Sequence, residues 1–303
     1  MAHISVVILN HNTRDLLRDS IRSVLVDASG HSRAVYVVDN ASTDGSAAMV
    51  SAEFPEVCLI RAPRNGGFAY GNNLALRAIL AEAPASGMSQ RFIMLLNPDA
   101  ALEPGSLDVL VTYLIENPRV GAVGPRLVLP DGSLDLACRR SFPTPEIAFY
   151  RMAGLSRLFP RSRRFGRYNL TFLDPAQETE VDALSGAAML VREEVVREVG
   201  LLDEQFFMYG EDLDWCYRIK SYGWHIVYQP RAVVRHHKRA ASTKRALPSI
   251  RAFYDAMRIF HRKHYASGTI APVNWLIETG IALREAWALG TNLLRPPARR
   301  RVG

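Results

Sequence analysis

Three acidic residues stand within four consecutive positions of the segment Phe206–Arg218, which reads FFMYGEDLDWCYR. Glu211, Asp212 and Asp214 open a predicted helix over 211–222, where acidic side chains suit the positive end of the helix dipole. That role does not explain all three, since Asp212 and Asp214 cannot both cap one helix N-terminus and aromatic residues flank the group. The cluster is therefore a candidate for chemistry that needs carboxylates.

Polar side chains also follow most of the apolar runs that are typical of buried strands. Ligands of an open parallel sheet bind beyond the carboxyl ends of its strands, so several polar strand ends together predict a binding site. Taken singly, Asp39 and Asn40 favour turn or cap roles, and a lone histidine after a strand is more often structural than a ligand. The polar groups are Asn10, His11 and Asn12 after Ser5–Leu9, Asp39 after Ala34–Val38, Asn97 and Asp99 after Phe92–Leu96, and His236 and His237 after Ala232–Val234.

A glycine-rich stretch, Arg64–Asn73, reads RNGGFAYGNN and opens a predicted helix over 66–80. It matches neither G-x-G-x-x-G nor G-x-x-x-x-G-K-[ST], which argues against dinucleotide oxidoreductases and P-loop ATPases. Its glycines could still let the backbone approach a nucleotide at the start of a helix.

For these residues to form one site, strands and helices must alternate along the chain so that the strand ends meet. The first hundred residues show this alternation. Short buried strands separated by helices are typical of a parallel sheet flanked by helices, so an α/β fold is predicted. The predicted strands are Ser5–Leu9, Ala34–Val38, Val57–Ile60 and Phe92–Leu96, with helices between them that end near Val26, Phe54 and Leu80.

The rest of the chain is less regular. Residues 139–167 contain eight arginines and one acid, Glu146, with prolines between them, which predicts a mobile basic loop. Beyond it we expect strands at Ala187–Val191, His225–Tyr228 and Ala232–Val234, and helices at 192–199, 211–222, 248–264 and 272–294.

Composition narrows the class of protein. The chain has 303 residues, of which 48% are hydrophobic and 22% charged, which excludes disordered and collagen-like classes. Its three cysteines are widely spaced and odd in number, so we expect no disulfide framework and a reducing compartment. The N-terminus lacks a basic leader followed by a long apolar run, and no signal peptide is predicted.

Charge is distributed unevenly between the two ends. The net formal charge is −5 over residues 1–230 and +12 over residues 231–303, a pattern typical of a terminal segment that meets an anionic membrane or a nucleic acid. The last predicted helix, 272–294, contains Glu278, Arg284 and Glu285, which argue against a membrane span.

The same helix is amphipathic, with a polar stripe and an apolar side that favours either a membrane surface or packing on the rest of the protein. The stripe consists of Asn274, Glu278, Glu285 and Asn292, and the apolar side consists of Trp275, Leu276, Leu283, Trp287, Leu293 and Leu294.

Taken together, these motifs resemble the family 2 glycosyltransferases of the GT-A fold, and most of all the bacterial rhamnosyltransferase type. The resemblance covers about residues 4–237 and is specific for the family, but not for the sugar or acceptor. The matching segments, in family order, are Ser5–Asn12, Val38–Gly45, Asn65–Asn73, Asn97–Asp99, Ser185–Arg192 and Phe206–Arg218. It implies a catalytic domain over 1–240, with a nucleotide-binding half at 1–100 and an acceptor half at 101–240, and a basic helical extension at 241–303.

The resemblance also implies a role for each matching residue. Asp212 corresponds to the catalytic base, and Asp99 to the last acid of the family's D-x-D metal motif, whose first position here is Asn97. His236 lies where some relatives supply a metal-binding histidine, and His237 is the less favoured choice. The nucleotide-sugar site would contain Asn10, His11, Asp39, Asn65, Gly67, Asn73 and Asn97, and the acceptor side or loop support Gly186, Glu211 and Asp214.

This assignment agrees with simple chemistry. A hard divalent ion needs only one or two protein ligands besides phosphate, so Asp99 and His236 would suit Mg²⁺ or Mn²⁺ as the cofactor. An ionised Asp212 can accept a proton from an acceptor hydroxyl. One base without a second nucleophile predicts a single displacement with inversion at the sugar.

The expected enzyme therefore takes a nucleotide-diphosphate sugar, such as dTDP-rhamnose, to a glycan or lipid-linked acceptor. It would act as a peripheral protein on the cytoplasmic face of the cell membrane, with the last helix on the bilayer. Two alternatives are weaker. A sugar-nucleotide pyrophosphorylase needs a Gly-rich loop with Arg and Lys after the first strand, and Asn10–Arg14 lacks it. An inactive membrane or nucleic-acid adaptor explains the basic C-terminus, but not Asp99, Asp212 and His236 in matching places.

Overall fold

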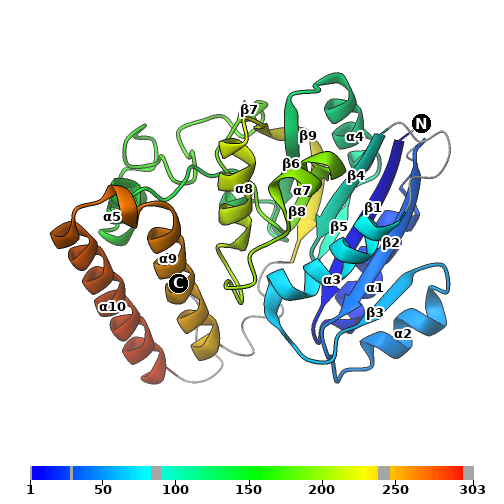
Figure 1. The fold of residues 1–303 in the computed structure, drawn as a ribbon, viewed down its shortest axis with the longest axis horizontal. Coiled ribbons are helices and arrows are strands. Elements are labelled where there is room, and N and C mark those ends of the chain that lie inside the picture. Colours follow the sequence, from blue (N-terminus) through cyan, green and yellow to red (C-terminus); the bar gives the residue numbers. More distant parts are fainter. Residues whose placement is uncertain (1, 28–29, 83–89, 238–245, 296–303) are drawn as a thin grey trace.

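The computed structural model describes residues 2–27, 30–82, 90–237 and 246–295. Within these residues, nine strands form one sheet in the order β3-β2-β1-β4-β8-β6-β9-β5, and β7 pairs with β9 (Figure 1). The strands are β1 (Ala2–Asn10), β2 (Ser32–Asp39), β3 (Cys58–Arg61), β4 (Gln90–Leu96), β5 (Ala100–Leu102), β6 (Val120–Val128), β7 (Thr179–Glu180), β8 (Ala188–Arg192) and β9 (His225–His236).

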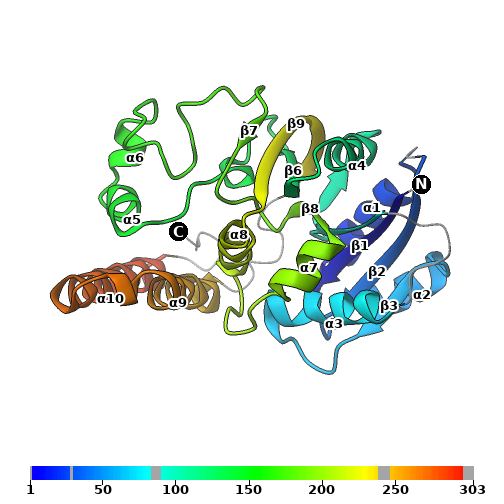
Figure 2. The ribbon, with the colours of Figure 1, turned by 45° about the horizontal axis from the view of Figure 1, so that its top comes forward.

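Helices flank this sheet and continue beyond it into the C-terminal extension (Figures 1 and 2). They are α1 (Arg14–Leu25), α2 (Ser46–Glu53), α3 (Gly67–Ala81), α4 (Ser106–Glu116), α5 (Pro145–Met152), α6 (Leu155–Leu158), α7 (Glu193–Val199), α8 (Glu211–Ser221), α9 (Ala246–His264) and α10 (Ala271–Leu293), with short 3₁₀ turns η1 (Leu136–Cys138) and η3 (Ala266–Gly268).

The N-terminal part of the sheet agrees with the sequence. β1 pairs in parallel with β2 and β4, and β2 pairs in parallel with β3. The residue pairs Asn10↔Asp39 and Ile8↔Leu96 show that these strands end at the same edge. The apolar runs are buried because helices cover both faces of a parallel sheet. The predicted α/β fold is confirmed for this part.

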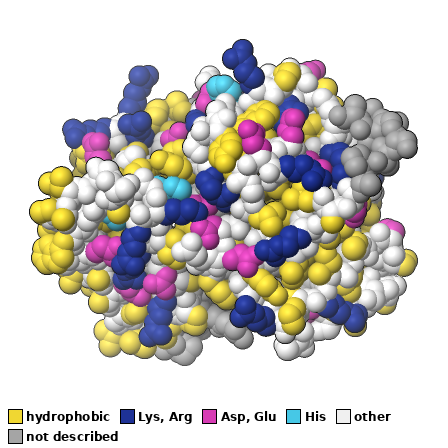
Figure 3. Space-filling view, viewed as in Figure 1, with side chains coloured by type: hydrophobic (Ala, Val, Ile, Leu, Met, Phe, Trp, Pro, Cys, Tyr) yellow, Lys and Arg dark blue, Asp and Glu magenta, His cyan; other side chains and the backbone are white. Residues whose placement is uncertain are grey.

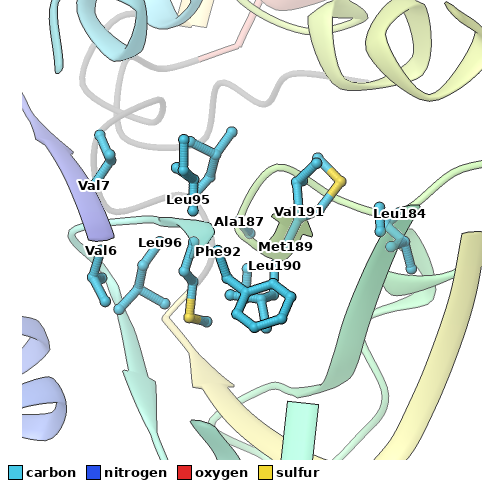
Figure 4. Packing of buried hydrophobic residues seen from close by; sticks show 14 of the residues in the cluster. Val6, Val7, Phe92, Leu95, Leu96, Leu184, Ala187, Met189, Leu190 and Val191 are labelled. Atoms are coloured by element: carbon cyan, nitrogen blue, oxygen red, sulfur yellow. The ribbon is translucent and has the colours of Figure 1, made fainter. Parts of the chain in front are cut away.

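The second part of the sheet is mixed rather than parallel. β8 lies between β4 and β6 and runs antiparallel to both, while β6 and β9 are parallel. Figure 4 shows side chains of β4 and β8, among them Phe92 and Leu190, packed together in the core. Overall, four strand pairs are parallel and four antiparallel, and all the antiparallel pairs involve β8, β5 or β7.

Three features of residues 101–240 differ from the sequence prediction. The segment 139–167 is not a single loop, because it contains α5 and α6 and begins with two buried arginines, Arg139 and Arg140. The two short strands predicted at His225–Tyr228 and Ala232–Val234 form one strand, β9. Its pairing with β6 shifts register opposite Pro125 and Arg126. α4 and β6 are additional elements that the sequence pattern did not reveal.

The C-terminal extension consists of α9 and α10, as predicted, and α9 is fixed to α8. Phe260 and His264 of α9 pack on Tyr217 of α8, with ring centroids 6.1 and 4.1 Å from the Tyr217 ring. Buried Asp214 of α8 lies 2.7 Å from His264 Nε2 and 2.8 Å from Lys263 Nζ. None of the helices in the described residues is long and apolar enough to cross a membrane.

α10 packs on α9 through its polar stripe and through buried Ile281, which forms an apolar cluster with Ile250 and Tyr254 of α9. Three polar contacts cross the seam between the two helices, and they leave the opposite side of α10 to solvent. The contacts are Arg262 Nε to Glu278 Oε1 at 2.6 Å, Arg258 to Glu285, and His261 Nε2 to Asn274 Oδ1 at 2.8 Å.

The exposed side of α10 is apolar. Five of its large side chains, and that of Leu294 directly after it, are each at least 60% exposed, the reverse of the usual arrangement in a globular protein. Figure 3 shows hydrophobic side chains gathered along the left edge of the molecule, where α10 lies. The exposed residues are Trp275, Leu276, Leu283, Trp287, Leu293 and Leu294.

Candidate active site

The carboxyl ends of β1 and β2 form a buried polar corner. Asn10 and Asp39 are register partners, and Asn10 Nδ2 donates to Asp39 Oδ1 at 3.3 Å. Asn10 also donates to Ser42 Oγ at 3.0 Å, and Asp39 Oδ2 accepts from the Ser42 backbone N–H. Both side chains are at most 5% exposed, so they build the wall of the corner and hold the turn after β2.

His11 lies on the same corner and is half-buried. Its Nδ1 is 2.9 Å from the carbonyl oxygen of Asn40, and its Nε2 is 3.2 Å from Asn12 Nδ2. Asn12 adopts a positive φ of 58° and accepts from the Thr43 N–H at 2.7 Å. The two turns that follow β1 and β2 are therefore linked, with the His11 ring between them.

The glycine-rich start of α3 is tied to this corner and to the segment before α8. Asn40 Nδ2 donates to Asn65 Oδ1 at 3.0 Å and to the Gly67 carbonyl at 3.2 Å. Phe68 N–H donates to the Phe207 carbonyl at 2.7 Å. Gly67 has a φ of +91°, and a Cβ atom there would lie 2.2 Å from Phe207 O, so only glycine fits.

Asn73 supports the same segment from inside α3. It is 1% exposed, accepts from the Leu202 N–H at 3.1 Å, and donates to the Leu202 carbonyl and to Glu204, each at 2.9 Å. Both ends of its amide are thus used within the protein. We assign Asn73 to holding the segment 202–204 rather than to direct contact with a nucleotide.

Asp99 and His236 meet although 137 positions separate them in the sequence. Ala100 at the start of β5 pairs with His236 at the end of β9, which places Asp99 beside the histidine. Asp99 Oδ1 lies 3.5 Å from His236 Nε2, and Asn97 Nδ2 is also 3.5 Å from that nitrogen. His237 contributes its backbone, whose N–H donates to the Asp99 carbonyl, and its side chain is exposed.

A second carboxylate holds the other side of the His236 ring. Asp135, at the turn before η1, places Oδ2 3.0 Å from His236 Nδ1, and both residues are buried. Burial alone lowers the pKa of His236, but its hydrogen bonds to Asp135 and Asp99 outweigh burial and raise the pKa to about 9. Without a bound metal the ring is therefore protonated at neutral pH and paired with both acids.

The spacing of Asp99 and His236 fits a divalent metal ion. Two ligands at right angles, each about 2.1 Å from an octahedral ion, lie roughly 3 Å apart, close to the 3.5 Å found here. In the described part of the chain, no group of three or more His, Cys, Asp or Glu side chains could hold a metal ion. Asp99 and His236 would supply two ligands, and the donor diphosphate and water the rest.

Asp212 lies in the first turn of α8, where three donors hold its carboxylate. Oδ2 accepts from Arg140 Nη2 at 2.7 Å and from the Gly186 N–H at 3.1 Å, and Oδ1 accepts from the Leu213 N–H at 2.8 Å. A carboxylate has about four lone-pair sites, so one on Oδ1 stays available for an acceptor hydroxyl. The side chain is 13% exposed.

The two acids beside Asp212 have different environments. Burial and the neighbouring Asp212 carboxylate raise the pKa of Glu211 to about 8, so Glu211 is protonated at neutral pH. Burial alone would raise the pKa of Asp214, but hydrogen bonds from His264, Lys263 and Arg218 outweigh it and lower the pKa to about 2. Glu211 is thus neutral and Asp214 fully paired, which leaves Asp212 as the acid of the three with an open lone pair.

The sites described above share one edge of the sheet. Asn97 N–H donates to the Ala187 carbonyl at 2.8 Å, and the adjacent Gly186 N–H donates to Asp212. The structure therefore connects the metal-site residues to the acidic cluster through the start of β8. It adds two charged residues that sequence motifs did not reveal, Arg140 and Asp135, because each meets its partner across 72 or more residues.

Comparison with known proteins identifies the kind of protein. The family described as "Glycosyltransferase like family 2" matches residues 2–252. An N-acetylglucosaminyl-diphospho-decaprenol L-rhamnosyltransferase of Mycobacterium tuberculosis is 32% identical over 270 residues, which cover 88% of this chain and 87% of that protein.

Solved structures agree with the fold. A mannosyltransferase from Pyrobaculum calidifontis, in complex with GDP-Man and Mn²⁺, aligns with a TM-score of 0.55 at 17% identity, over 95% of this chain and 72% of its own. GalNAc-T7 with UDP, GalNAc and Mn²⁺ aligns with a TM-score of 0.59 at 14% identity, over 96% of this chain and 58% of its own. At such identities the likeness shows the fold, and the fold is GT-A.

Proposed function

We propose that this chain, which belongs to glycosyltransferase family 2, is an inverting transferase that moves a sugar from a nucleotide-diphosphate sugar to a glycan or lipid-linked acceptor in cell-envelope polysaccharide synthesis. The observation that carries the proposal is one sheet edge with three features. It combines a buried polar corner after β1 and β2, the Asp99–His236 pair, and Asp212, whose carboxyl group has an open lone pair.

We choose dTDP-rhamnose as the first donor to test, since the relative with 32% identity is named as an L-rhamnosyltransferase. The donor's base and ribose would lie against the corner formed by His11 and Asp39. The start of α3 would form the next wall of the nucleotide pocket. The N–H groups of Gly66, Gly67 and Phe68 are already bonded to Asn40, Asn65 and Phe207, so this segment would shape the pocket rather than donate to the nucleotide.

In the proposed reaction, an acceptor hydroxyl donates a hydrogen bond to Asp212 Oδ1. Its oxygen forms a bond to the anomeric carbon as the bond from that carbon to the phosphate oxygen breaks. The electron pair leaves with the nucleoside diphosphate, and the hydroxyl proton passes to Asp212. A single displacement inverts the anomeric carbon, and the protonated Glu211 and paired Asp214 offer no second nucleophile.

Asp99 and His236 would hold a divalent metal ion, Mg²⁺ or Mn²⁺. Such an ion, when bound, stabilises the negative charge that develops on the departing diphosphate. Arg140 keeps the Asp212 carboxylate oriented through its 2.7 Å contact, and Gly186 does so through its backbone N–H.

We also propose that the enzyme is peripheral on the inner face of the cell membrane, with α10 on the lipid surface. The proposal is supported by the exposed apolar side of α10 and its two tryptophans, Trp275 and Trp287, since tryptophan favours the membrane–water interface. The acceptor named for the mycobacterial relative, a diphospho-decaprenol, is membrane-bound by its lipid.

A donor and acceptor panel tests the catalytic part. Purified protein with Mn²⁺ is offered dTDP-rhamnose and UDP-sugars together with a short-chain N-acetylglucosaminyl-diphospho-prenol. Transfer with a product whose anomeric configuration is opposite to that of the donor supports the proposal. Retention of configuration contradicts the single displacement. Neither binding nor transfer of any nucleotide sugar would favour the inactive adaptor.

A further inference from the structure

Both carboxylate oxygens of Asp135 have a defined partner in the structure. Oδ1 accepts from the Ala137 backbone N–H at 3.0 Å, and Oδ2 lies 3.0 Å from His236 Nδ1. Asp135 is 1% exposed and lies in the turn between β6 and η1, on the side of the imidazole ring opposite Asp99. No motif of the sequence singles it out.

This arrangement determines which ring nitrogen carries a proton. An ionised carboxylate only accepts hydrogen bonds, so Nδ1 must donate to Asp135. A neutral ring in this position then has its lone pair on Nε2, the nitrogen that faces Asp99 Oδ1 at 3.5 Å. A histidine binds a metal through an unprotonated nitrogen, and the partner of its other nitrogen sets the tautomer.

We propose that Asp135 is a positioning residue that fixes His236 in the tautomer able to bind a divalent cation at Asp99. The proposal rests on the metal site of the proposed function. It adds the requirement that an acid, 101 residues away in the chain, is hydrogen-bonded to Nδ1 of the histidine.

The geometry also predicts that asparagine cannot replace Asp135. An asparagine of the same shape has one oxygen and one NH₂ group. The oxygen is needed by the half-buried Ala137 N–H, because two N–H donors cannot face each other. The NH₂ group must then donate to His236 Nδ1, which moves the ring proton to Nε2 and removes the metal-binding lone pair.

The test compares Mn²⁺ binding by full-length variants in the presence of dTDP, followed by the EPR signal of free Mn²⁺. Asp135→Asn is expected to bind Mn²⁺ about 10- to 100-fold more weakly than wild type, approaching His236→Ala, without a comparable fall in melting temperature. Asp135→Glu keeps a carboxylate and should recover part of the affinity. Asp131→Asn is the matched control, because Asp131 is an exposed acid of the same turn whose carboxylate accepts hydrogen bonds from Ser133, and the variant should bind Mn²⁺ like wild type.

Long-range ¹H–¹⁵N spectra of the histidine rings give a readout that does not depend on activity. With Mg²⁺ and dTDP in both samples, wild-type His236 should carry its proton on Nδ1, whereas Asp135→Asn should keep it on Nε2. Wild-type affinity in Asp135→Asn, or an Nδ1 proton in that variant, would overturn the proposal. If Asp99→Ala and His236→Ala also bind Mn²⁺ like wild type, the proposed metal site itself is wrong. That outcome is distinct from a failure of the Asp135 proposal alone, because all variants would then have the wild-type Mn²⁺ affinity.

Discussion

At the scale of single residues, three neighbouring carboxyl groups have three different surroundings. Glu211 faces the protein interior, Asp214 is bound by three basic side chains of α8 and α9, and Asp212 faces Arg140 and the Gly186 N–H. The sequence alone could not distinguish them, since the residues that make the difference come from distant segments. The structure explains why one acid of the three is suited to accept a proton.

Replacing Asp212 should separate catalysis from donor binding. Asp212→Asn keeps the shape of the side chain but removes the proton acceptor, which typically lowers the rate about 10²- to 10⁴-fold. The dissociation constant for the nucleotide sugar should change little. Turnover and donor titration measure the two effects, and Glu116→Gln, at an exposed acid on α4, is the control. A near-normal kcat in Asp212→Asn would mean that another group is the base.

The raised pKa of Glu211 predicts how stability depends on pH. The folded state holds a proton on Glu211 up to about pH 8, while the unfolded chain releases it near its ordinary pKa of 4.5. The free energy of unfolding should therefore fall as pH rises from about 4.5 to 8, and Glu211→Gln should lack this part of the decline.

Urea denaturation at several pH values checks this sign. The stability of Glu211→Gln relative to wild type should increase up to about pH 8 and then stay constant. A difference that is independent of pH, or that grows toward acid, would contradict the assignment of a neutral Glu211.

At the scale of elements, the start of α3 and the segment before α8 depend on each other. Gly67 is in contact with the Phe207 carbonyl, and Asn73 binds Leu202 and Glu204. From the other side, α9 holds α8 through Asp214 and packs Phe253 on Tyr209. The segment that carries Asp212 is thus fixed both by the nucleotide side of the molecule and by the C-terminal extension.

Gly67→Ala should disturb this junction far more than a Gly→Ala substitution at a site that has the same backbone strain but no neighbouring atom to clash with. Gly105 has a similar φ of +79°, but nothing lies within 4 Å of a Cβ added there, so Gly105→Ala is the matched control. We expect Gly67→Ala to weaken dTDP binding and lower the melting temperature more than the control does. Equal effects in both variants would show that the contact with Phe207 is unimportant.

The sequence predicts a helix or strand only where its residues leave a recognisable pattern. The buried strands β1, β2, β4 and β8 are continuous apolar runs, so periodicity finds them. β6 contains Gly121, Gly124 and Pro125, which usually indicate turns. Here Gly121 makes room for Trp224 and Gly124 for Leu184, because a Cβ atom would lie 2.9 and 2.6 Å from those side chains. Such close approaches are properties of the tertiary structure.

The candidate site shows the same limit. The resemblance to family motifs identifies Asp99, Asp212 and His236 as candidates, because residues of the expected types occur in the expected order along the chain. Arg140 and Asp135 stand in segments with no recognisable pattern, and their partners are 72 and 101 residues away. Pairing of β5 with β9 brings Asp99 beside His236, and the bridge between Arg140 and Ala183 brings Arg140 to the segment before β8, where the Gly186 N–H contacts Asp212.

At the scale of the whole molecule, polarity is reversed in the last helix. The polar stripe predicted from the sequence exists, but it faces α9, through Glu278, Glu285 and Asn274. Six large apolar residues face solvent instead. An apolar surface of this kind on a basic extension is typical of a protein that binds an anionic lipid surface.

Leu283→Gln combined with Trp287→Gln should weaken binding to vesicles that contain anionic lipid by about tenfold or more, since burying each side chain is worth about 1.5–3 kcal/mol. Co-sedimentation of the full chain measures the effect. Val26→Gln removes an equally exposed apolar side chain from the end of α1 and should leave binding unchanged. Equal binding of the α10 variant and wild type would contradict a membrane role for this helix.

The central place of β8 also has a consequence for how the chain is made. β8 pairs with β4 on one side and β6 on the other, and both strands precede it in the chain. The edges of β4 and β6 that β8 covers therefore have no partner until Arg192 has been synthesised. At about 5–20 residues per second, the 64 residues from Leu129 to Arg192 take roughly 3–13 s. During that interval the nascent chain presents two open strand edges of the kind that pair with other chains. The edges that β8 later covers are therefore open to pairing with other chains for several seconds during synthesis.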